Sequence, residues 1–227
     1  MSNIYAGSTT TTALITTGDT SGNLVLQTGS TPTTAMTINS SQIVNFANAP
    51  TVGGNPLPSG AMTLISTQTA SLSSSLSWTG LSGYGSYLLV FNNLVPNTNG
   101  GGIRVQVGTG STTYITSGYS NNTNLVNVGS SSIYYDTGAT YIGIGTSNGM
   151  TNSGVGASGF LYFESLSGTN SMLSVNGIVT AQYSTGSASS EIINGSLPSN
   201  TTTKTAIQIN SNSTIKSGTA SLYGISS

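Results

Sequence analysis

The stretch IRVQVG, residues 103–108, alternates apolar and polar side chains with a period of two. In an extended chain, Ile103, Val105 and Val107 point to one side, and the polar residues between them point to the other. This alternation predicts a β-strand with one covered face. Patterns of the same kind recur along most of the chain, so the stretch indicates the fold class.

Further strand signals lie on both sides of this stretch. Ile207 and Ile209 flank a glutamine. In an extended chain Phe160, Tyr162 and Glu164 would lie opposite Leu161, Phe163 and Ser165. Residues 87–91 are continuously apolar, which predicts a central strand covered on both faces. No segment keeps apolar residues at the 3.6 spacing of a helix over three turns. We therefore expect an all-β chain with minimal helix.

The composition fits a folded β protein. Ser, Thr, Asn and Gly make up 128 of the 227 residues. Such a polar bias can indicate disorder, but 35% of the residues are hydrophobic and only 3% are charged, whereas disordered chains usually carry much charge. Residue types that favour strands, such as Thr, Val, Ile and Tyr, are common.

A break in the pattern divides the chain. GGNPLPSG, residues 53–60, holds two prolines and three glycines, which mark a turn or linker. We expect residues 56–60 to be a Gly/Pro linker. Residues 61–227 are then an outer β-sandwich of jelly-roll type, and residues 1–55 are a shorter N-terminal segment.

The N-terminal segment has too few apolar residues for a core of its own. Its short strands would leave bare edges in a single chain, and association of several copies would cover them. The pattern favours an intertwined oligomer without choosing three copies over two. The candidates for a shared core are Leu24, Leu26, Met36, Ile38, Val44 and Phe46.

Residues 8–54, STTTTALITTGDTSGNLVLQTGSTPTTAMTINSSQIVNFANAPTVGG, resemble a segment of structural proteins from tailed bacteriophages, especially phages of aquatic bacteria. Residues 76–96, 103–114 and 217–226 resemble strands of phage fibre and decoration proteins more loosely. The resemblance implies a virion protein that is a homotrimer. It also implies docking on capsid, tail or neck proteins through the N-terminal part, with a β-sandwich facing outward.

The few charges exclude several function classes. The acids are Asp19, Asp136, Glu164 and Glu191, and the bases are Arg104, Lys204 and Lys216. Three scattered cations make no patch for nucleic acid or for an anionic membrane. His and Cys are absent, which removes the commonest general base and the usual ligands of transition metals. We expect no metal and no cofactor.

Catalysis would have to come from carboxyl groups. Glycoside hydrolysis usually needs two of them about 5 to 9.5 Å apart. Asp136, Glu164 and Glu191 are the acids of the outer domain, and no motif joins any two of them. The sequence therefore favours a protein that is not an enzyme.

Aromatic residues are the best candidates for contact with a sugar, because tyrosine offers an apolar face and a hydroxyl. The candidates are Tyr134, Tyr135, Tyr114, Tyr119, Tyr141 and Trp78. Tyr134 and Tyr135 are adjacent, so in a strand one of the two must point outward.

These observations favour a short trimeric fibre or spike that attaches a phage to glycans on the host surface. Two alternatives stay open: a cement protein that decorates and stabilises the capsid, and a tail spike that degrades polysaccharide.

Overall fold

The computed structural model describes residues 2–5, 15–17, 23–28, 30–31, 33–41, 43–46, 51–52, 55–56, 62–127, 130–144, 149–164, 166, 172–197 and 202–226. Strands make up 72% of these residues and helices none, so the all-β prediction is confirmed. No helix in this part of the chain is long and apolar enough to cross a membrane. The chain forms two compact units, Met1–Ser59 and Gly60–Ser227. Of the predicted linker at 56–60, only Pro56 lies within the described residues.

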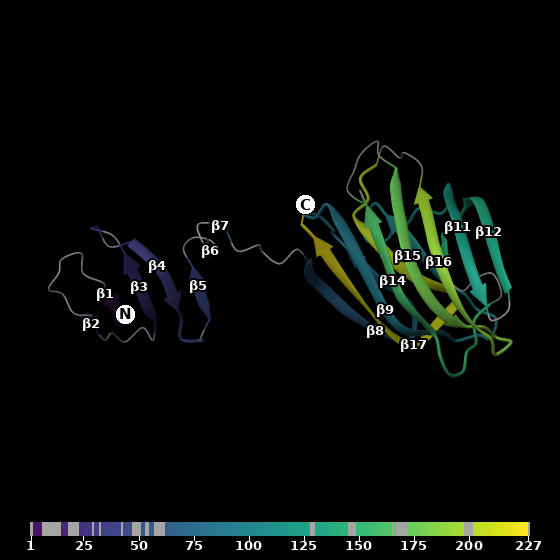
Figure 1. The fold of residues 1–227 in the computed structure, drawn as a ribbon, viewed down its shortest axis with the longest axis horizontal. Coiled ribbons are helices and arrows are strands. Elements are labelled where there is room, and N and C mark those ends of the chain that lie inside the picture. The colour runs from purple at the N-terminus through teal and green to yellow at the C-terminus, as the bar shows by residue number, and fades with distance from the viewer. Residues whose placement is uncertain are drawn as a thin grey trace. The chain divides into compact units, whose positions relative to one another are not determined.

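The first unit contains a five-stranded sheet with the order β2-β1-β3-β4-β5 (Figure 1). Its strands are β1 (Ser2–Tyr5), β2 (Ile15–Thr17), β3 (Leu24–Thr28), β4 (Thr33–Ile38) and β5 (Val44–Phe46), and β6 (Thr51–Val52) pairs separately with β7 (Asn55–Pro56). Asn39 closes the turn between β4 and β5. Its Oδ1 accepts hydrogen bonds from the backbone N–H groups of Ser41 (3.0 Å) and Ile43 (2.9 Å).

The second unit is built from one large, nearly closed antiparallel sheet of ten strands. The strands are β8 (Met62–Thr79), β9 (Ser86–Pro96), β10 (Ile103–Gly108), β11 (Tyr119–Asn127), β12 (Ser130–Ala139), β13 (Ile142–Ile144), β14 (Ala157–Glu164), β15 (Leu173–Gln182), β16 (Ala188–Leu197) and β17 (Ala206–Ile225). The order is β12-β11-β16-β15-β14-β9-β17-β10-β13, and β8 also pairs with β17.

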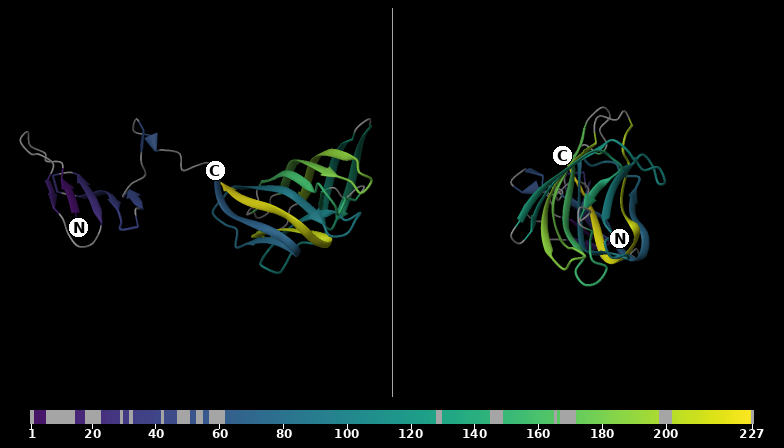
Figure 2. Two further views of the ribbon diagram at one scale, coloured as in Figure 1. Left: turned by 90° about the horizontal axis from the view of Figure 1, so that it is seen from below. Right: turned by 90° about the vertical axis from the view of Figure 1, so that its right-hand side faces the viewer.

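The long strands β8 and β17 allow the sheet to curve back on itself (Figure 2). β17 pairs with β8 along most of its length, with β10 over its first part and with β9 over its second. The register shifts between Asn210 and Ile215, and Leu72, which precedes the β8 partner of Ile215, has a φ of 54°. Irregularities of this kind bend strands and increase their twist.

The inner face of the curved sheet holds the hydrophobic core. Phe163, Val175 and Gly195 follow one another across β14, β15 and β16, and the two apolar side chains of this row are fully buried. β13 packs against this face, because a Cβ at Gly195 would lie 2.7 Å from Cδ1 of Ile142. The absence of a side chain at Gly195 therefore makes room for β13.

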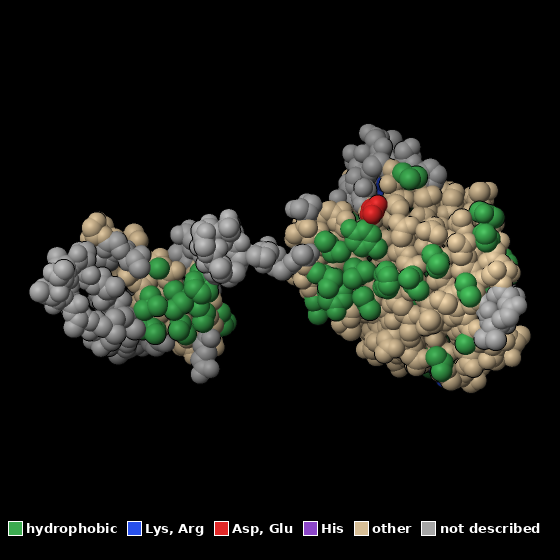
Figure 3. All heavy atoms as spheres, in the orientation of Figure 1, with side chains coloured by type: hydrophobic (Ala, Val, Ile, Leu, Met, Phe, Trp, Pro, Cys, Tyr) green, Lys and Arg blue, Asp and Glu red, His purple; other side chains and the backbone are tan. Residues whose placement is uncertain are grey.

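The outer face of the same sheet is only partly covered. β9 lies between β14 and β17, and its Leu89 is buried, but Val90 is 39% exposed. The prediction that both faces of residues 87–91 are covered is therefore wrong, because the side chain of Val90 on the outer face is exposed. Val90, Phe160, Ile178 and Ile192 lie in register across four neighbouring strands and form an outer apolar row. Figure 3 shows hydrophobic side chains grouped on the face of this unit that carries β9 and β14.

Candidate functional site

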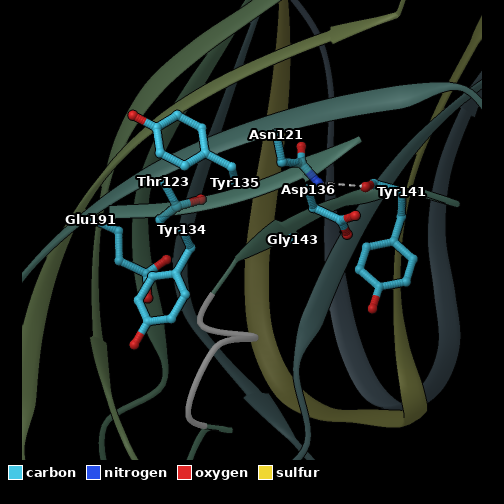
Figure 4. Close-up of a pocket in the computed structure, with 8 residues that line it drawn as sticks. All are labelled: Asn121, Thr123, Tyr134, Tyr135, Asp136, Tyr141, Gly143 and Glu191. Carbon is cyan, nitrogen blue, oxygen red and sulfur yellow. Dashed lines mark hydrogen bonds between the residues drawn. The ribbon is translucent and has the colours of Figure 1, made fainter. Parts of the chain in front are cut away.

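A cavity of about 260 Å³ opens beside β12, the last strand at one end of the large sheet (Figure 4). We call it the concave pocket. It is lined by Asn121, Thr123, Tyr134, Tyr135, Asp136, Tyr141, Gly143 and Glu191.

Strand register brings most of these side chains to the inner face. On β11 and β12, Asn121 is opposite Asp136 and Thr123 is opposite Tyr134. Paired residues, and residues two apart on one strand, share a face. Glu191 joins them from β16, where it is the partner of Leu125 on β11. Two consecutive strands and a third that lies far along the sequence thus contribute to one pocket.

Glu191 lines the pocket and is only 1% exposed. The hydroxyl of Tyr183, which is itself buried, donates a hydrogen bond to Oε1 of Glu191 (2.8 Å). A buried carboxyl group is costly unless it is hydrogen-bonded, so this contact both stabilises Glu191 and fixes its direction.

Tyr141 forms another wall of the pocket and is held from two sides. The Arg104 guanidinium lies over its ring, 4.4 Å from the ring centroid, in a cation–π contact. The side-chain Nδ2 of Asn121 donates a hydrogen bond to the Tyr141 carbonyl (2.8 Å), which is drawn in Figure 4. Oδ1 of Asn121 is enclosed and has no hydrogen-bond partner among the described residues.

Of the six aromatic residues predicted to contact a sugar, three border the concave pocket: Tyr134, Tyr135 and Tyr141. Tyr134 is 40% exposed, and its ring lies on the same side as Glu191. Tyr135 is 72% exposed, and its ring points away from that of Tyr134 (Figure 4). This divergence follows from the alternation of side chains along β12.

The other three aromatic residues lie elsewhere, and two of them are unsuited to surface contact. Tyr119 is fully buried, and its hydroxyl accepts a hydrogen bond from the Val107 N–H (2.9 Å). Trp78 is also buried, and its Nε1 donates to the Ser66 carbonyl (3.3 Å). Both were predicted as glycan contacts, and both belong to the core because their strands turn these side chains inward. Tyr114 is half-buried and is not among the residues that line the pocket.

Sequence reasoning did not place Asn121, Thr123, Asp136 and Glu191 at a sugar site. Asp136 and Glu191 had been considered only as acids joined by no motif. The period-two spacing of Tyr134 and Asp136 was a usable signal, because it puts both on one face of a strand. Glu191 reaches the pocket only because β11 pairs with β16. No pattern in the sequence around Glu191 indicates this position.

The six residues predicted for a shared core lie together on the sheet of the first unit. Leu24, Ile38 and Val44 are in register across β3, β4 and β5. Leu26, Met36 and Phe46 form a second row beside them. Four of the six are half-buried, whereas Val44 is 45% and Phe46 53% exposed. We call this surface the N-terminal apolar face.

Within the described part of the chain, no three His, Cys, Asp or Glu residues gather in a way that could hold a metal ion. No protein-family model, curated protein or solved structure matches this chain.

Proposed function

We propose that this chain is a non-enzymatic structural protein of a tailed-phage particle that attaches the particle to glycans on the host surface. The observation that supports it best is the concave pocket, in which tyrosine rings lie beside hydrogen-bonding groups. An aromatic face with nearby polar acceptors is suited to a sugar, which has both C–H faces and hydroxyl groups.

The position in a virion rests on the phage resemblance of residues 8–54, which include the N-terminal apolar face. In this proposal the first unit docks on a capsid, tail or neck protein. The second unit, a sandwich of jelly-roll type, then faces outward and presents the concave pocket.

The proposed homotrimer would cover the N-terminal apolar face. This face carries two in-register rows of apolar side chains without a charged residue on β3, β4 or β5. Leaving such a surface in water is unfavourable, and contiguous exposed apolar patches usually mark interaction sites. Three linked pockets would also convert weak contacts with single sugars into firm attachment through avidity.

Competition with intact particles tests this function. Soluble full-length protein, incubated with host cells beforehand, should block adsorption of the phage. The Tyr134→Ala variant should lose this ability, because it removes an aromatic wall of the pocket. Ile133→Ala is the matched control and should block like the wild type, since Ile133 is exposed on the same strand and does not line the pocket. An antibody against the chain should decorate purified particles, and failure to find the protein on them would refute the virion assignment.

One observation favours a second candidate function, the cleavage of polysaccharide. Asp136 and Glu191 both line the concave pocket, and glycosidases usually work through two carboxyl groups. Incubation of purified protein with the host's surface polysaccharide distinguishes the two. Release of reducing sugar that is lost in both Asp136→Asn and Glu191→Gln would support cleavage, whereas binding without release supports attachment alone.

A further inference from the structure

We propose that a second hollow, formed around Arg104, binds the oxyanion of an acidic glycan, either a carboxylate or a phosphate ester carried on a pyranose ring. This inference rests on the function proposed above, because it names the class of glycan that the particle would recognise. The hollow measures about 580 Å³ and shares one wall, Tyr141, with the concave pocket. We call it the Arg104 hollow.

Strand register places Arg104 in this hollow. Arg104 on β10 is the partner of Asn210 on β17, which is in turn the partner of Ser75 on β8. All three line the hollow. The neighbours Ile103 and Val105 on β10 are fully buried in the core, so the alternation of the strand turns Arg104 to the opposite face of the sheet.

The ring of Tyr141 holds the guanidinium by one of its faces, 4.4 Å from the ring centroid. Stacking of this kind uses the plane of the guanidinium and leaves the N–H groups along its edge for other partners. Nε of Arg104 is enclosed and has no hydrogen-bond partner among the described residues, and the side chain as a whole is half-buried. The exposed edge is therefore suited to a charge-assisted, forked contact with an oxyanion.

The amide side chains beside Arg104 are already paired with one another. Nδ2 of Asn210 donates to Oε1 of Gln106 (2.6 Å) and to Oε1 of Gln208 (3.1 Å). Nε2 of Gln208 donates in turn to the hydroxyl of Ser77 (3.1 Å). This network fixes the wall next to Arg104, and none of its members carries a charge that would neutralise the guanidinium.

No carboxyl group lines the Arg104 hollow. Asp136 lines the concave pocket instead, and no ion pair joins it to Arg104, although the structure describes both residues. The other two bases of the chain lie elsewhere: Lys204 is buried, and Lys216 donates to the Asn152 carbonyl (3.0 Å). Of the three bases, Arg104 is therefore the one best suited to an external anion.

The size and the charge of the hollow together indicate an acidic sugar. A volume of about 580 Å³ lies within the roughly 300–1,000 Å³ that is usual for ligand sites, so there is room for a ring as well as its charged group. Hydrogen bonds to a charged group contribute more than bonds between neutral groups. We expect an acidic pyranoside to bind at least about tenfold more tightly than its neutral form, and added salt should reduce this ratio.

NMR titration of the isotope-labelled full-length protein tests the inference. Arg104 is the only arginine of the chain, so its Nε–H gives a single side-chain signal. Methyl glucopyranoside, methyl glucuronide and methyl glucoside 6-phosphate are added in separate titrations, and the galacto forms make a second series. In a series that binds, an acidic form should shift the Arg104 signal at a concentration at least about tenfold lower than the neutral form. The single tryptophan, Trp78, is buried in the core, and its indole signal should stay in place.

Three variants separate recognition by Arg104 from general attraction of anions, with affinities measured by ligand-observed NMR. Arg104→Gln should weaken binding of the acidic forms at least about tenfold and leave the neutral form unchanged. Lys216→Gln is the matched control, because it removes the same charge from an exposed side chain outside the hollow, and it should change neither. Arg104→Lys keeps the charge without the planar fork and should recover only part of the affinity.

The outcomes separate this inference from the proposed function. If the Arg104 signal responds equally to acidic and neutral forms, or to none, or if Lys216→Gln weakens binding as much as Arg104→Gln, the anion site is wrong. The proposed function still stands in that case if the soluble protein blocks phage adsorption and Tyr134→Ala does not. If acidic forms bind through Arg104 but the wild-type protein does not block adsorption, the anion site stands and attachment to the host is wrong.

Discussion

The hydroxyl of Tyr119 is buried in the core of the large unit, where it accepts a hydrogen bond from the Val107 N–H (2.9 Å). Burial raises the pKa of Tyr119 to about 12, although the hydrogen bond from Val107 acts in the opposite direction. A polar group in this position contributes to stability only while it stays neutral and paired.

Stability should therefore fall at alkaline pH. The ordinary tyrosine pKa is 10.0, so between pH 10 and about 12 the unfolded chain loses the Tyr119 proton while the folded chain keeps it. The contribution is fully present below pH 10, and its loss amounts to up to about 3 kcal/mol. Burial, together with Tyr84, also raises the pKa of Tyr87, which acts in the same direction.

Denaturant unfolding of the wild type and of Tyr119→Phe from pH 8 to pH 11.5 measures the contribution of Tyr119. At pH 8 the variant should be less stable by roughly 1–3 kcal/mol, because the Val107 N–H loses its partner. The gap should narrow as the pH rises above 10. A gap that does not change with pH would contradict the burial argument.

Lys204 is a second buried polar residue, and its position is unfavourable. Its side chain is fully buried, and Nζ has no hydrogen-bond partner among the described residues. Burial lowers the pKa of this amine. The unfolded chain therefore binds the proton more tightly than the folded chain, so stability should rise with pH toward 10.5, the ordinary pKa.

Lys204→Met should stabilise the protein by roughly 1–3 kcal/mol at pH 7, because it keeps the apolar stem and removes the unpaired amine. Thermal unfolding measures the change. Lys216→Met is the matched control, since Lys216 is exposed, and it should shift stability by no more than about 0.5 kcal/mol. A loss of stability in Lys204→Met would show that the amine has a partner.

At the scale of elements, the packing of β13 against β16 connects the core to the concave pocket. Gly195 on β16 leaves space for the fully buried side chain of Ile142. β13 also carries Gly143, which lines the pocket, and Tyr141 directly precedes this strand. A shift of β13 should therefore reach the concave pocket.

Gly195→Ala should destabilise the large unit by roughly 1–3 kcal/mol, because the new methyl group would overlap Ile142. Adding Ile142→Val should recover part of the loss, and the double-mutant cycle should give a coupling of at least about 0.5 kcal/mol. Gly110→Ala is the control, since a Cβ there meets no atom within 4 Å. Strictly additive effects would show that the two residues do not pack together.

At the scale of the whole molecule, the N-terminal apolar face predicts the oligomeric state. If it is the shared surface of a homotrimer, light scattering of the full chain should give three times the chain mass of 22.8 kDa. Phe46→Ser with Val44→Ser should return the mass of one chain, because it makes the exposed edge of that face polar. Ile133→Ser with Val126→Ser removes equally exposed apolar groups from the second unit and should leave the trimer intact. A wild-type chain that is monomeric would refute the trimer.

The sequence by itself determined the all-β class and several strand positions. Ile103, Val105 and Val107 alternate as required for β10 and are fully buried, because an alternating pattern specifies a one-faced strand without reference to its neighbours. The same local rule showed that Tyr134 and Tyr135 must diverge.

Pairing between strands that are far apart in the sequence decided which side chains are buried and which meet in the pocket. Trp78 and Tyr119 looked like contact residues, but the curvature of the sheet placed both in the core. Glu191 lies 55 positions after Asp136, and only the order β12-β11-β16 brings the two into one pocket. A periodicity shows which side chains share a face of one strand, but it does not show which strands lie side by side. That choice depends on the total burial and hydrogen bonding of the complete sheet, which is a property of the tertiary structure.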